Sequence, residues 1–234
     1  MEFDAVILSG GRSSRLGGVH KPALMYDGAT LLERALQAAG GASAVAVVGP
    51  DPGTLPPGVL ACREDPPFSG PAAAIAAGLS ALARHAQDRH RAPAPYTLVL
   101  ACDMPRVQTA VRALLAAAAE WPPGDGLMAV STDGRRQPLV GFYGTAVLQQ
   151  HISDAARRGA LLNASVFGLL ARLDVREVGV PGGATDDVDT WDDAAALGVT
   201  GPPGVHSGDI HGQGPAPGAP ELEPTLEANS EKPG

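Results

Sequence analysis

Residues 5–21 read AVILSGGRSSRLGGVHK, an apolar run followed by a glycine-rich loop with two arginines, a histidine and a lysine. The apolar run is short and is stopped by glycines, which predicts a buried strand over residues 5–9. Glycines let backbone N–H groups approach a phosphate, and arginine and lysine neutralise its charge. The pattern therefore predicts a phosphate-binding loop, against the alternative of a glycine-rich surface loop with incidental charges.

Two common phosphate loops do not fit this sequence. A Walker loop requires G-x4-G-K-[ST], but Lys21 is preceded by a histidine and followed by a proline. The dinucleotide fingerprint G-x-G-x-x-G also fails, because the glycines form two pairs, at 10–11 and 17–18, that lie too far apart. The missing fingerprint disfavours a dinucleotide-dependent oxidoreductase.

Strand and helix patterns alternate along the chain as far as residue 198. Apolar runs predict further strands over 44–48, 58–62, 96–101, 126–131, 139–143 and 175–180. Helical patterns occupy 30–39, 71–84, 108–119, 145–156, 161–170 and 190–197. This alternation predicts βαβ units and a mainly parallel sheet, whose ligands bind at the carboxyl ends of the strands. The opening loop and Asp103 are both expected there.

The composition indicates a globular chain with a local rather than a general positive charge. Hydrophobic residues make up 44% and aromatic residues 4%, so the core must consist mostly of alanine, valine and leucine. Residues 1–198 hold 16 Lys and Arg against 20 Asp and Glu, a balance that does not favour nucleic-acid binding. Cys62 and Cys102 form no CxxC or Cys/His cluster, so neither a disulfide framework nor a structural zinc site is expected.

Residues 199–234 differ from the rest of the chain. They are rich in glycine, proline and acids and show no periodic apolar pattern, which predicts a folded domain over 1–198 and a disordered acidic tail over 199–234. His206 and His211 are interpreted as solvated tail residues rather than metal ligands. No apolar run approaches 18 residues and no signal-peptide pattern follows Met1, so a cytoplasmic protein without a membrane partner is expected.

Residues 8–21, LSGGRSSRLGGVHK, resemble the L-[AS]-G-G-x-[SA]-x-R-[ML]-G signature of the small nucleotidyltransferases. The second glycine pair and Lys21 make the loop most similar to that of molybdenum cofactor guanylyltransferase, although that subgroup often has aspartate where this chain has His20. The resemblance implies an α/β three-layer sandwich with a mainly parallel, Rossmann-like central sheet over residues 1–198. It implies catalytic roles for Arg15 and Lys21, and nucleotide binding by Leu8, Ser9, Gly10, Gly11 and Lys21.

Asp103 lies just past a predicted buried strand, in TLVLACDMP at residues 97–105. A carboxylate at this place can hold Mg²⁺, which prefers oxygen ligands and substrate phosphates. The alternative is an aspartate that caps a turn or a helix. The motif resembles the family's [AC]-D-[ML]-P, which implies that Asp103 is catalytic, binds the nucleotide and is the ligand of Mg²⁺. Cys102 is interpreted as a small buried neighbour.

Residues 63–79, REDPPFSGPAAAIAAGL, resemble the family segment in which an aspartate that contacts the nucleotide precedes Gly-Pro. Asp65 is the candidate here, with a simple loop carboxylate as the equal alternative. The Gly-Pro pair at 70–71 is expected to open a helix whose amino end offers partial positive charge to the ligand.

Two further stretches resemble the acceptor side of the family's cleft. Residues 135–143, RRQPLVGFY, resemble Q-P-L-x-[AG]-x-[YW], which implies that Gln137 binds the acceptor; the two arginines either face an acceptor phosphate or are solvated. Residues 185–193, TDDVDTWDD, resemble [ND]-x-[ND]-T-P. Asp187 and Asp189 fit this motif, and Trp191 replaces its proline. Asp189 is expected to help with the acceptor, and a metal role is left open.

The resemblance implies an Mg²⁺-dependent enzyme that transfers GMP from GTP to molybdopterin, with transient contact to molybdoenzymes or other proteins of cofactor biosynthesis. Three alternatives stay open. One is a sister transferase that uses CTP with a molybdenum pterin, and another acts on a phosphosugar or other phosphorylated acceptor. The third is a nucleotide-binding protein without catalysis. No single residue of the sequence identifies the base.

Overall fold

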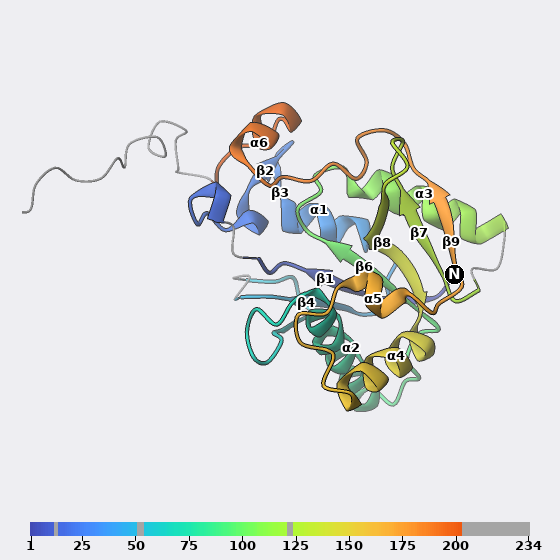
Figure 1. Ribbon diagram of the computed structural model, residues 1–234. Coiled ribbons are helices and arrows are strands. Elements are labelled where there is room, and N and C mark those ends of the chain that lie inside the picture. Colours follow the sequence, from blue (N-terminus) through green and yellow to red (C-terminus); the bar gives the residue numbers. More distant parts are fainter. Residues whose placement is uncertain (12–13, 51–53, 121–123, 203–234) are drawn as a thin grey trace, which may run out of the picture.

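The computed structural model describes residues 1–11, 14–50, 54–120 and 124–202, and its centre is a seven-stranded sheet (Figure 1). The strand order is β5-β4-β1-β6-β8-β7-β9. The strands are β1 (Phe3–Leu8), β4 (Val45–Val48), β5 (Val59–Cys62), β6 (Tyr96–Ala101), β7 (Gly126–Val130), β8 (Arg136–Gly144) and β9 (Val175–Gly179). β8 is antiparallel to both of its neighbours, whereas the other strand pairs are parallel. Among these seven strands, β8 alone is reversed, so the sheet is mainly parallel as predicted.

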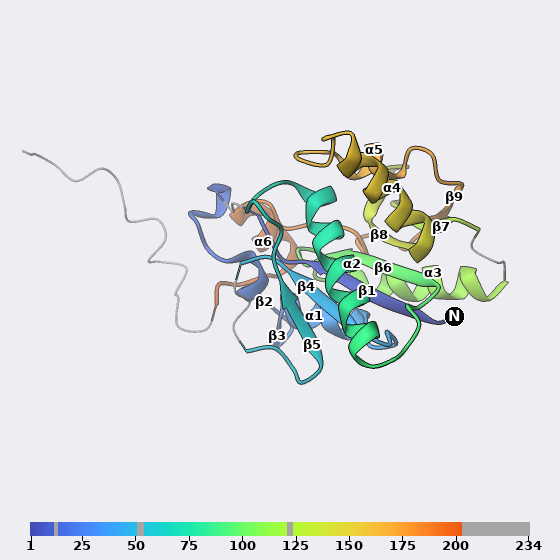
Figure 2. The ribbon, with the colours of Figure 1, turned by 90° about the horizontal axis from the view of Figure 1, so that it is seen from below.

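Helices cover both faces of the sheet and complete a three-layer α/β sandwich (Figures 1 and 2). α1 (Leu31–Ala38) and α3 (Val107–Glu120) pack on one face. α2 (Pro71–Asp88), α4 (Thr145–Arg157) and α5 (Val166–Leu170) pack on the other. The predicted Rossmann-like fold class is therefore confirmed.

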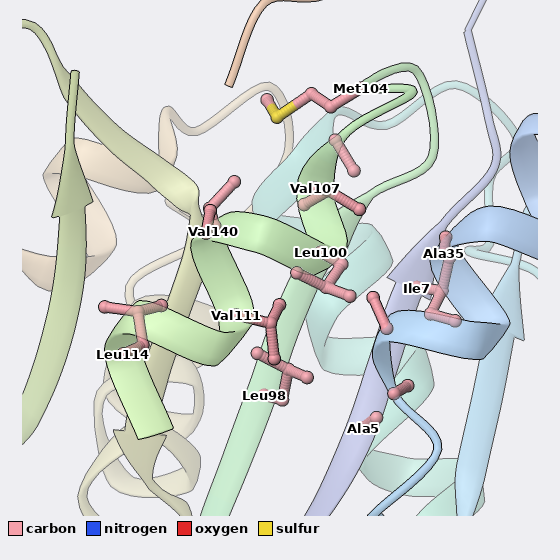
Figure 3. Close-up of a cluster of buried hydrophobic side chains, with 14 of the residues drawn as sticks. Ala5, Ile7, Ala35, Leu98, Leu100, Met104, Val107, Val111, Leu114 and Val140 are labelled. Carbon is pink, nitrogen blue, oxygen red and sulfur yellow. The ribbon is translucent and has the colours of Figure 1, made fainter. Parts of the chain in front are cut away.

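The two faces of the sheet are set by the alternation of side chains along each strand. Ala5 and Ile7 of β1 belong to the core beneath α1 and α3, while Val6 and Leu8 belong to the core beneath α2. Figure 3 shows the first core, in which Leu98 and Leu100 of β6 face the apolar side of α3. Strands that are buried on both faces read as continuous apolar runs, which is why the sequence revealed them.

One predicted helix is shorter than expected. The pattern over 161–170 predicted a helix, but α5 begins only at Val166. Asn163 has a φ of 57°, which is not helical, and its N–H donates to the Ser69 carbonyl over 2.7 Å. Ser165 then caps the helix by accepting a hydrogen bond from the N–H of Gly168. The apolar residues before 166 thus belong to a loop that packs beside α2.

A small third core lies at the end of the sheet where β1 finishes. It joins α6 (Trp191–Leu197), the short 3₁₀ helices η1 (Ser14–Leu16) and η2 (Lys21–Ala23), and the hairpin of β2 (Met25–Tyr26) and β3 (Ala29–Thr30). Figure 1 shows α6 beside this hairpin. Its buried members are Leu16, Leu24, Leu31, Val188, Ala194 and Val199. This core holds the opening loop against the C-terminal part of the described chain.

The described structure continues past residue 198, where the sequence predicted the end of the folded domain. Val199 is buried in the third core, and the backbone of Thr200 exchanges two 2.9 Å hydrogen bonds with that of Met25. A valine and a β-branched threonine are well suited to this pairing, although they carry too short a pattern to be recognised in the sequence. The rest of the predicted tail, residues 203–234, lies outside the described residues.

In the part of the chain that the structure describes, no helix is long and apolar enough to cross a membrane.

Candidate active site

A pocket of about 300 Å³ opens at the carboxyl ends of β1 and β6. Most of its lining comes from the loop after β1 with η2, the segment after β6, and the start of α2 with the loop before it. The residues that line it include Leu8, Ser9, Gly10, Gly11, His20, Lys21, Glu64, Phe68, Gly70, Pro71, Cys102 and Asp103. The structure thus gathers around one pocket all the residues predicted to bind the nucleotide except Asp65.

The start of the loop is fixed to the neighbouring strand. Both the N–H and the hydroxyl of Ser9 donate to the carbonyl of Val48, over 2.8 Å and 3.1 Å. A Cβ at Gly49 would lie 2.6 Å from the Ser9 hydroxyl, so only glycine fits beside it. Gly10 and Gly11 follow as exposed residues at the pocket, where their backbone can approach a ligand.

Lys21 lies between the pocket and a group of carboxylates. Its Nζ is 2.6 Å from Oδ1 of Asp189 and 3.8 Å from Oδ2 of Asp103. The next residue, Pro22, is buried and fixes the backbone of η2. A lysine ammonium has three donors, so Lys21 can keep Asp189 and still donate to a phosphate in the pocket.

Arg15 lies at the edge of the same group. Its guanidinium is 4.0 Å from Asp189, and its side chain is 74% exposed. Arg15 does not line the pocket. The structure therefore places Lys21 at the centre of the site and Arg15 at its solvent side.

Asp103 is a half-buried acid at the end of β6, and its pKa is raised. Burial raises its pKa, the charges of Asp187 and Asp189 raise it further, and Lys21 opposes the shift. Among the described residues its Oδ1 has no hydrogen-bond partner, although that atom is buried. Its backbone carbonyl accepts from the N–H of Val188 over 3.0 Å, which draws the segment before α6 to the end of β6. Asp103 thus has a buried oxygen available for a cation.

The carboxylates of Asp103, Asp187 and Asp189 can hold a metal ion. Each offers an oxygen, and these oxygens lie within 4.8 Å of one another. Among the described residues, the three acids outnumber the two cations that pair with them, Lys21 and Arg15. Oxygen ligands and an unbalanced negative charge fit Mg²⁺. The family resemblance implied no role for Asp187. The signal available in the sequence was its place in the same motif, two residues before Asp189.

A second hollow, of about 290 Å³, lies on the other side of Asp103. It is lined by Ala101, Asp103, Met104, Arg135, Arg136, Gln137, Pro138, Leu139, Phe167 and Asp187. Ala101, Asp103 and Leu139 line both cavities, so the two cavities meet at Asp103. Gln137 reaches this end of the sheet because β8 runs opposite to its neighbours and therefore begins where they end. Gln137 thus lines the second cavity, whereas Asp189 lines neither cavity and lies against Lys21.

Asp65 does not join the pocket. It is exposed and lines neither cavity, whereas Glu64 is half-buried and lines the first one. The Glu64 carboxylate accepts a hydrogen bond from the N–H of Phe68, which turns it toward the loop before α2. Binding of the nucleotide by Asp65 therefore stays a prediction, and Glu64 is the acid of this segment that lines the pocket.

Cys102 is buried beside Asp103, and burial raises the pKa of its thiol far above the ordinary range. The thiol is therefore protonated at neutral pH and is not a nucleophile. This agrees with its interpretation as a small buried neighbour of the carboxylate.

Three similar solved structures have the same fold. The chain is 19% identical to molybdopterin-guanine dinucleotide biosynthesis protein A from Archaeoglobus fulgidus, with a TM-score of 0.57 over 83% of this chain and 96% of that one. It is 23% identical to Rv0371c from Mycobacterium tuberculosis H37Rv, with a TM-score of 0.59 over 84% and 97%. It is 21% identical to 2-C-methyl-D-erythritol 4-phosphate cytidylyltransferase from Thermus thermophilus, with a TM-score of 0.56 over 85% and 98%. At these identities the likeness concerns the fold.

One family model matches most of the chain. No curated protein matches this sequence. Residues 5–172 match the family model described as the MobA-like NTP transferase domain, and this range contains the glycine-rich loop, Lys21 and Asp103. It ends before the segment with Asp187 and Asp189, which the fold brings to Asp103. The chain therefore belongs to the family of MobA-like NTP transferase domains and is a nucleotidyltransferase.

Proposed function

We propose that this chain transfers GMP from GTP to the terminal phosphate of molybdopterin, giving molybdopterin guanine dinucleotide and pyrophosphate. The observation that carries the proposal is the meeting of two cavities at Asp103, with Lys21 and the glycine-rich loop on one side and Gln137 on the other. A transferase needs this arrangement, because donor and acceptor must lie side by side at the reacting phosphate. The choice of molybdopterin rests on the second glycine pair of the loop and on the name of the similar Archaeoglobus protein.

In the proposed reaction an oxygen of the acceptor phosphate attacks the α-phosphorus of GTP. The bond from that phosphorus to the bridging oxygen of the β-phosphate breaks, and pyrophosphate leaves with the electron pair. The attacking phosphate is already an anion, so the chain need not remove a proton from it. Its residues must instead bring two anions together and stabilise charge on the leaving group.

The residues of the first pocket can meet this demand. The exposed backbone at Gly10 and Gly11 can donate N–H groups to phosphate oxygens, and the Lys21 ammonium supplies a positive charge beside Asp103. The amino end of α2, at Gly70 and Pro71, also lines the pocket and adds partial positive charge. In the proposed complex these groups bind the triphosphate with its α-phosphate toward Asp103.

Asp103, with Asp187 and Asp189, would hold Mg²⁺ at the junction of the two cavities. When bound, Mg²⁺ neutralises phosphate oxygens that would otherwise repel the three carboxylates. The carboxylates in turn orient Lys21, which Asp189 already holds at 2.6 Å. The chain thus combines a positive phosphate loop with a negative metal site.

A second candidate is cytidylyl transfer to a phosphorylated polyol. It is favoured by the similar Thermus structure, a 2-C-methyl-D-erythritol 4-phosphate cytidylyltransferase that covers this chain as completely as the Archaeoglobus protein does. The lining of the first pocket offers backbone groups and Glu64 to a base, which does not by itself distinguish guanine from cytosine.

The test is pyrophosphate release by the purified protein with Mg²⁺, each of four nucleoside triphosphates in turn, and either molybdopterin or 2-C-methyl-D-erythritol 4-phosphate. We expect release with GTP and molybdopterin only. Release with CTP alone would overturn the proposed base while keeping the enzyme class. Release with the polyol phosphate alone would overturn the proposed acceptor, and nucleotide binding without release from any pair would indicate a non-catalytic protein.

A further inference from the structure

Phe167 is an exposed aromatic residue at the second hollow. Its side chain is 50% exposed, while its neighbours Val166, Leu169 and Leu170 in α5 are buried. Among the described residues, the large apolar side chains with this degree of exposure are Met1, Phe68, Leu162 and Phe167. Phe68 lines the first pocket and Phe167 lines the second. Each cavity that meets at Asp103 therefore has one exposed phenyl ring in its wall.

Phe167 also marks where the second hollow continues away from Asp103. A neighbouring hollow of about 450 Å³ runs between α5 and the strands β7 and β9, and both Phe167 and Arg136 line it as well as the second hollow. The Nε of Arg136 lies 2.5 Å from a carboxylate oxygen of Glu177 on β9, which holds this arginine. The second hollow and this neighbouring hollow share Arg136 and Phe167 in their walls, and the two together are called the groove.

The charged groups of the groove are placed unequally. Arg136 is paired with Glu177, but Arg135 forms no ion pair with a carboxylate of the described residues. Gln137 lies beside these arginines and offers two N–H donors. Asp103 and Asp187 make one end of this hollow acidic, so it is the part beside Arg135 and Gln137 that suits an anionic group, while the part at Phe167 suits an apolar or flat one.

We infer that this groove selects an acceptor with a phosphate at one end and a flat ring at the other, and that Phe167 is the residue that packs against the ring. The inference rests on the proposed nucleotidyl transfer and adds to it the residue that contacts the ring of the acceptor. An exposed phenyl ring gains contact area when a flat ring covers it, and it loses little conformational freedom. A ringless polyol phosphate would occupy only the part beside Arg135 and Gln137 and leave Phe167 uncovered.

The test compares two acceptors and two variants by titration calorimetry and by pyrophosphate release. Molybdopterin has a planar ring, and 2-C-methyl-D-erythritol 4-phosphate has none. We expect Phe167→Ala to weaken molybdopterin binding and raise its KM about tenfold, as is typical for loss of one stacked aromatic contact, and to leave the KM for GTP unchanged. Arg135→Ala should weaken both acceptors by similar factors, because each has a phosphate.

Control variants separate ring contact from general damage. Leu162 is 55% exposed in the loop before α5 and lines neither cavity, so Leu162→Ala should change no affinity. Phe167→Trp should retain molybdopterin binding and Phe167→Leu should not, since leucine keeps apolar volume but lacks a flat face. Thermal melting identifies any variant that has lost its fold.

The outcomes distinguish this inference from the proposed function. Equal molybdopterin binding by the wild type and Phe167→Ala would overturn the role of Phe167 and leave the transferase proposal standing. Phe167-dependent binding of molybdopterin together with release from CTP alone would support the groove and overturn the use of GTP. Binding of the polyol phosphate but not of molybdopterin would overturn both the ring-selective groove and the proposed acceptor.

Discussion

The Lys21 ammonium is held in the free protein by Asp189 and lies 3.8 Å from Asp103. Because it is the cation that lines the phosphate pocket from the opening loop, we expect Lys21→Ala to lower kcat/KM at least about 100-fold, the usual loss for a preorganised charge at the reacting group. Steady-state pyrophosphate release measures this. Arg112→Ala, an exposed arginine of α3, serves as the control. Near-wild-type turnover of Lys21→Ala would remove Lys21 from the proposed mechanism.

Replacing the Asp103 carboxylate by an amide should change stability and activity in opposite directions. Since burial raises its pKa, the folded protein takes up this proton more readily than the unfolded chain does. The ionised carboxylate therefore costs stability at neutral pH, and that cost disappears as the pH falls below the raised pKa. We expect Asp103→Asn to raise the melting temperature without metal by several degrees, where about 2–4 °C corresponds to 1 kcal/mol at this chain length. Its turnover should fall at least about 100-fold.

Melting curves with and without Mg²⁺ test this prediction. The wild type should gain stability from Mg²⁺ and Asp103→Asn should gain less, because its amide is a poorer ligand than a carboxylate. Asp65→Asn, an exposed acid outside both cavities, is the control and should melt and bind Mg²⁺ like the wild type. A lower melting temperature for Asp103→Asn would contradict the assigned cost of burial.

At the scale of elements, the contact of α2 with the sheet depends on a missing side chain. Gly78 is buried in this helix, and a Cβ there would lie 2.6 Å from one methyl carbon of Val6 and 3.1 Å from a methyl carbon of Val48. We expect Gly78→Ala to cost about 1–3 kcal/mol through overpacking, despite the better helix propensity of alanine. Urea unfolding measures the change. Ser80→Ala, exposed on the same helix, should be neutral or slightly stabilising, and an equal response of the two variants would contradict this account.

The sequence predicted elements well where burial leaves a pattern. The strand β6 and the helices α2 and α3 were found because long apolar runs and helical spacing mark them. The direction of β8 was not predicted, since an apolar run is the same whichever way the strand pairs. The hairpin of β2 and β3 was missed because two-residue strands are too short to show a period.

At the scale of the whole molecule, the site combines residues that local motifs predicted with residues that only the fold brings together. The glycine-rich loop and Asp103 were predicted from local motifs, and the fold brings them to one pocket. The pair of Lys21 and Asp189 joins residues 168 positions apart, and no local pattern reveals it. Phe167 belongs to no motif that the sequence showed. Its place at the second hollow depends on how α5 packs beside β8. Long-range packing therefore supplied what the sequence could not.

The C-terminal end of the described chain ties these distant parts together. Val199 is 5% exposed and packs in the third core with Leu16 of the opening loop and with Val188. Val188 lies between Asp187 and Asp189, two acids of the candidate metal site. A chain shortened to residues 1–198 loses this burial and the two hydrogen bonds between Met25 and Thr200. We expect it to be less stable by about 1.5–3 kcal/mol, the value of burying one such side chain, and to have a higher KM for the nucleotide.

A chain shortened to residues 1–202 is the matched control. It keeps Val199 and the Thr200 pairing and lacks only the Gly- and Pro-rich acidic segment, which shows no apolar pattern that could add to a core. Urea unfolding and pyrophosphate release of both shortened chains test the prediction. The longer one should match the full chain in both measurements. If the two shortened chains unfold at the same urea concentration, the third core does not depend on Val199. If both lose nucleotide affinity, residues 203–234 contribute to the site.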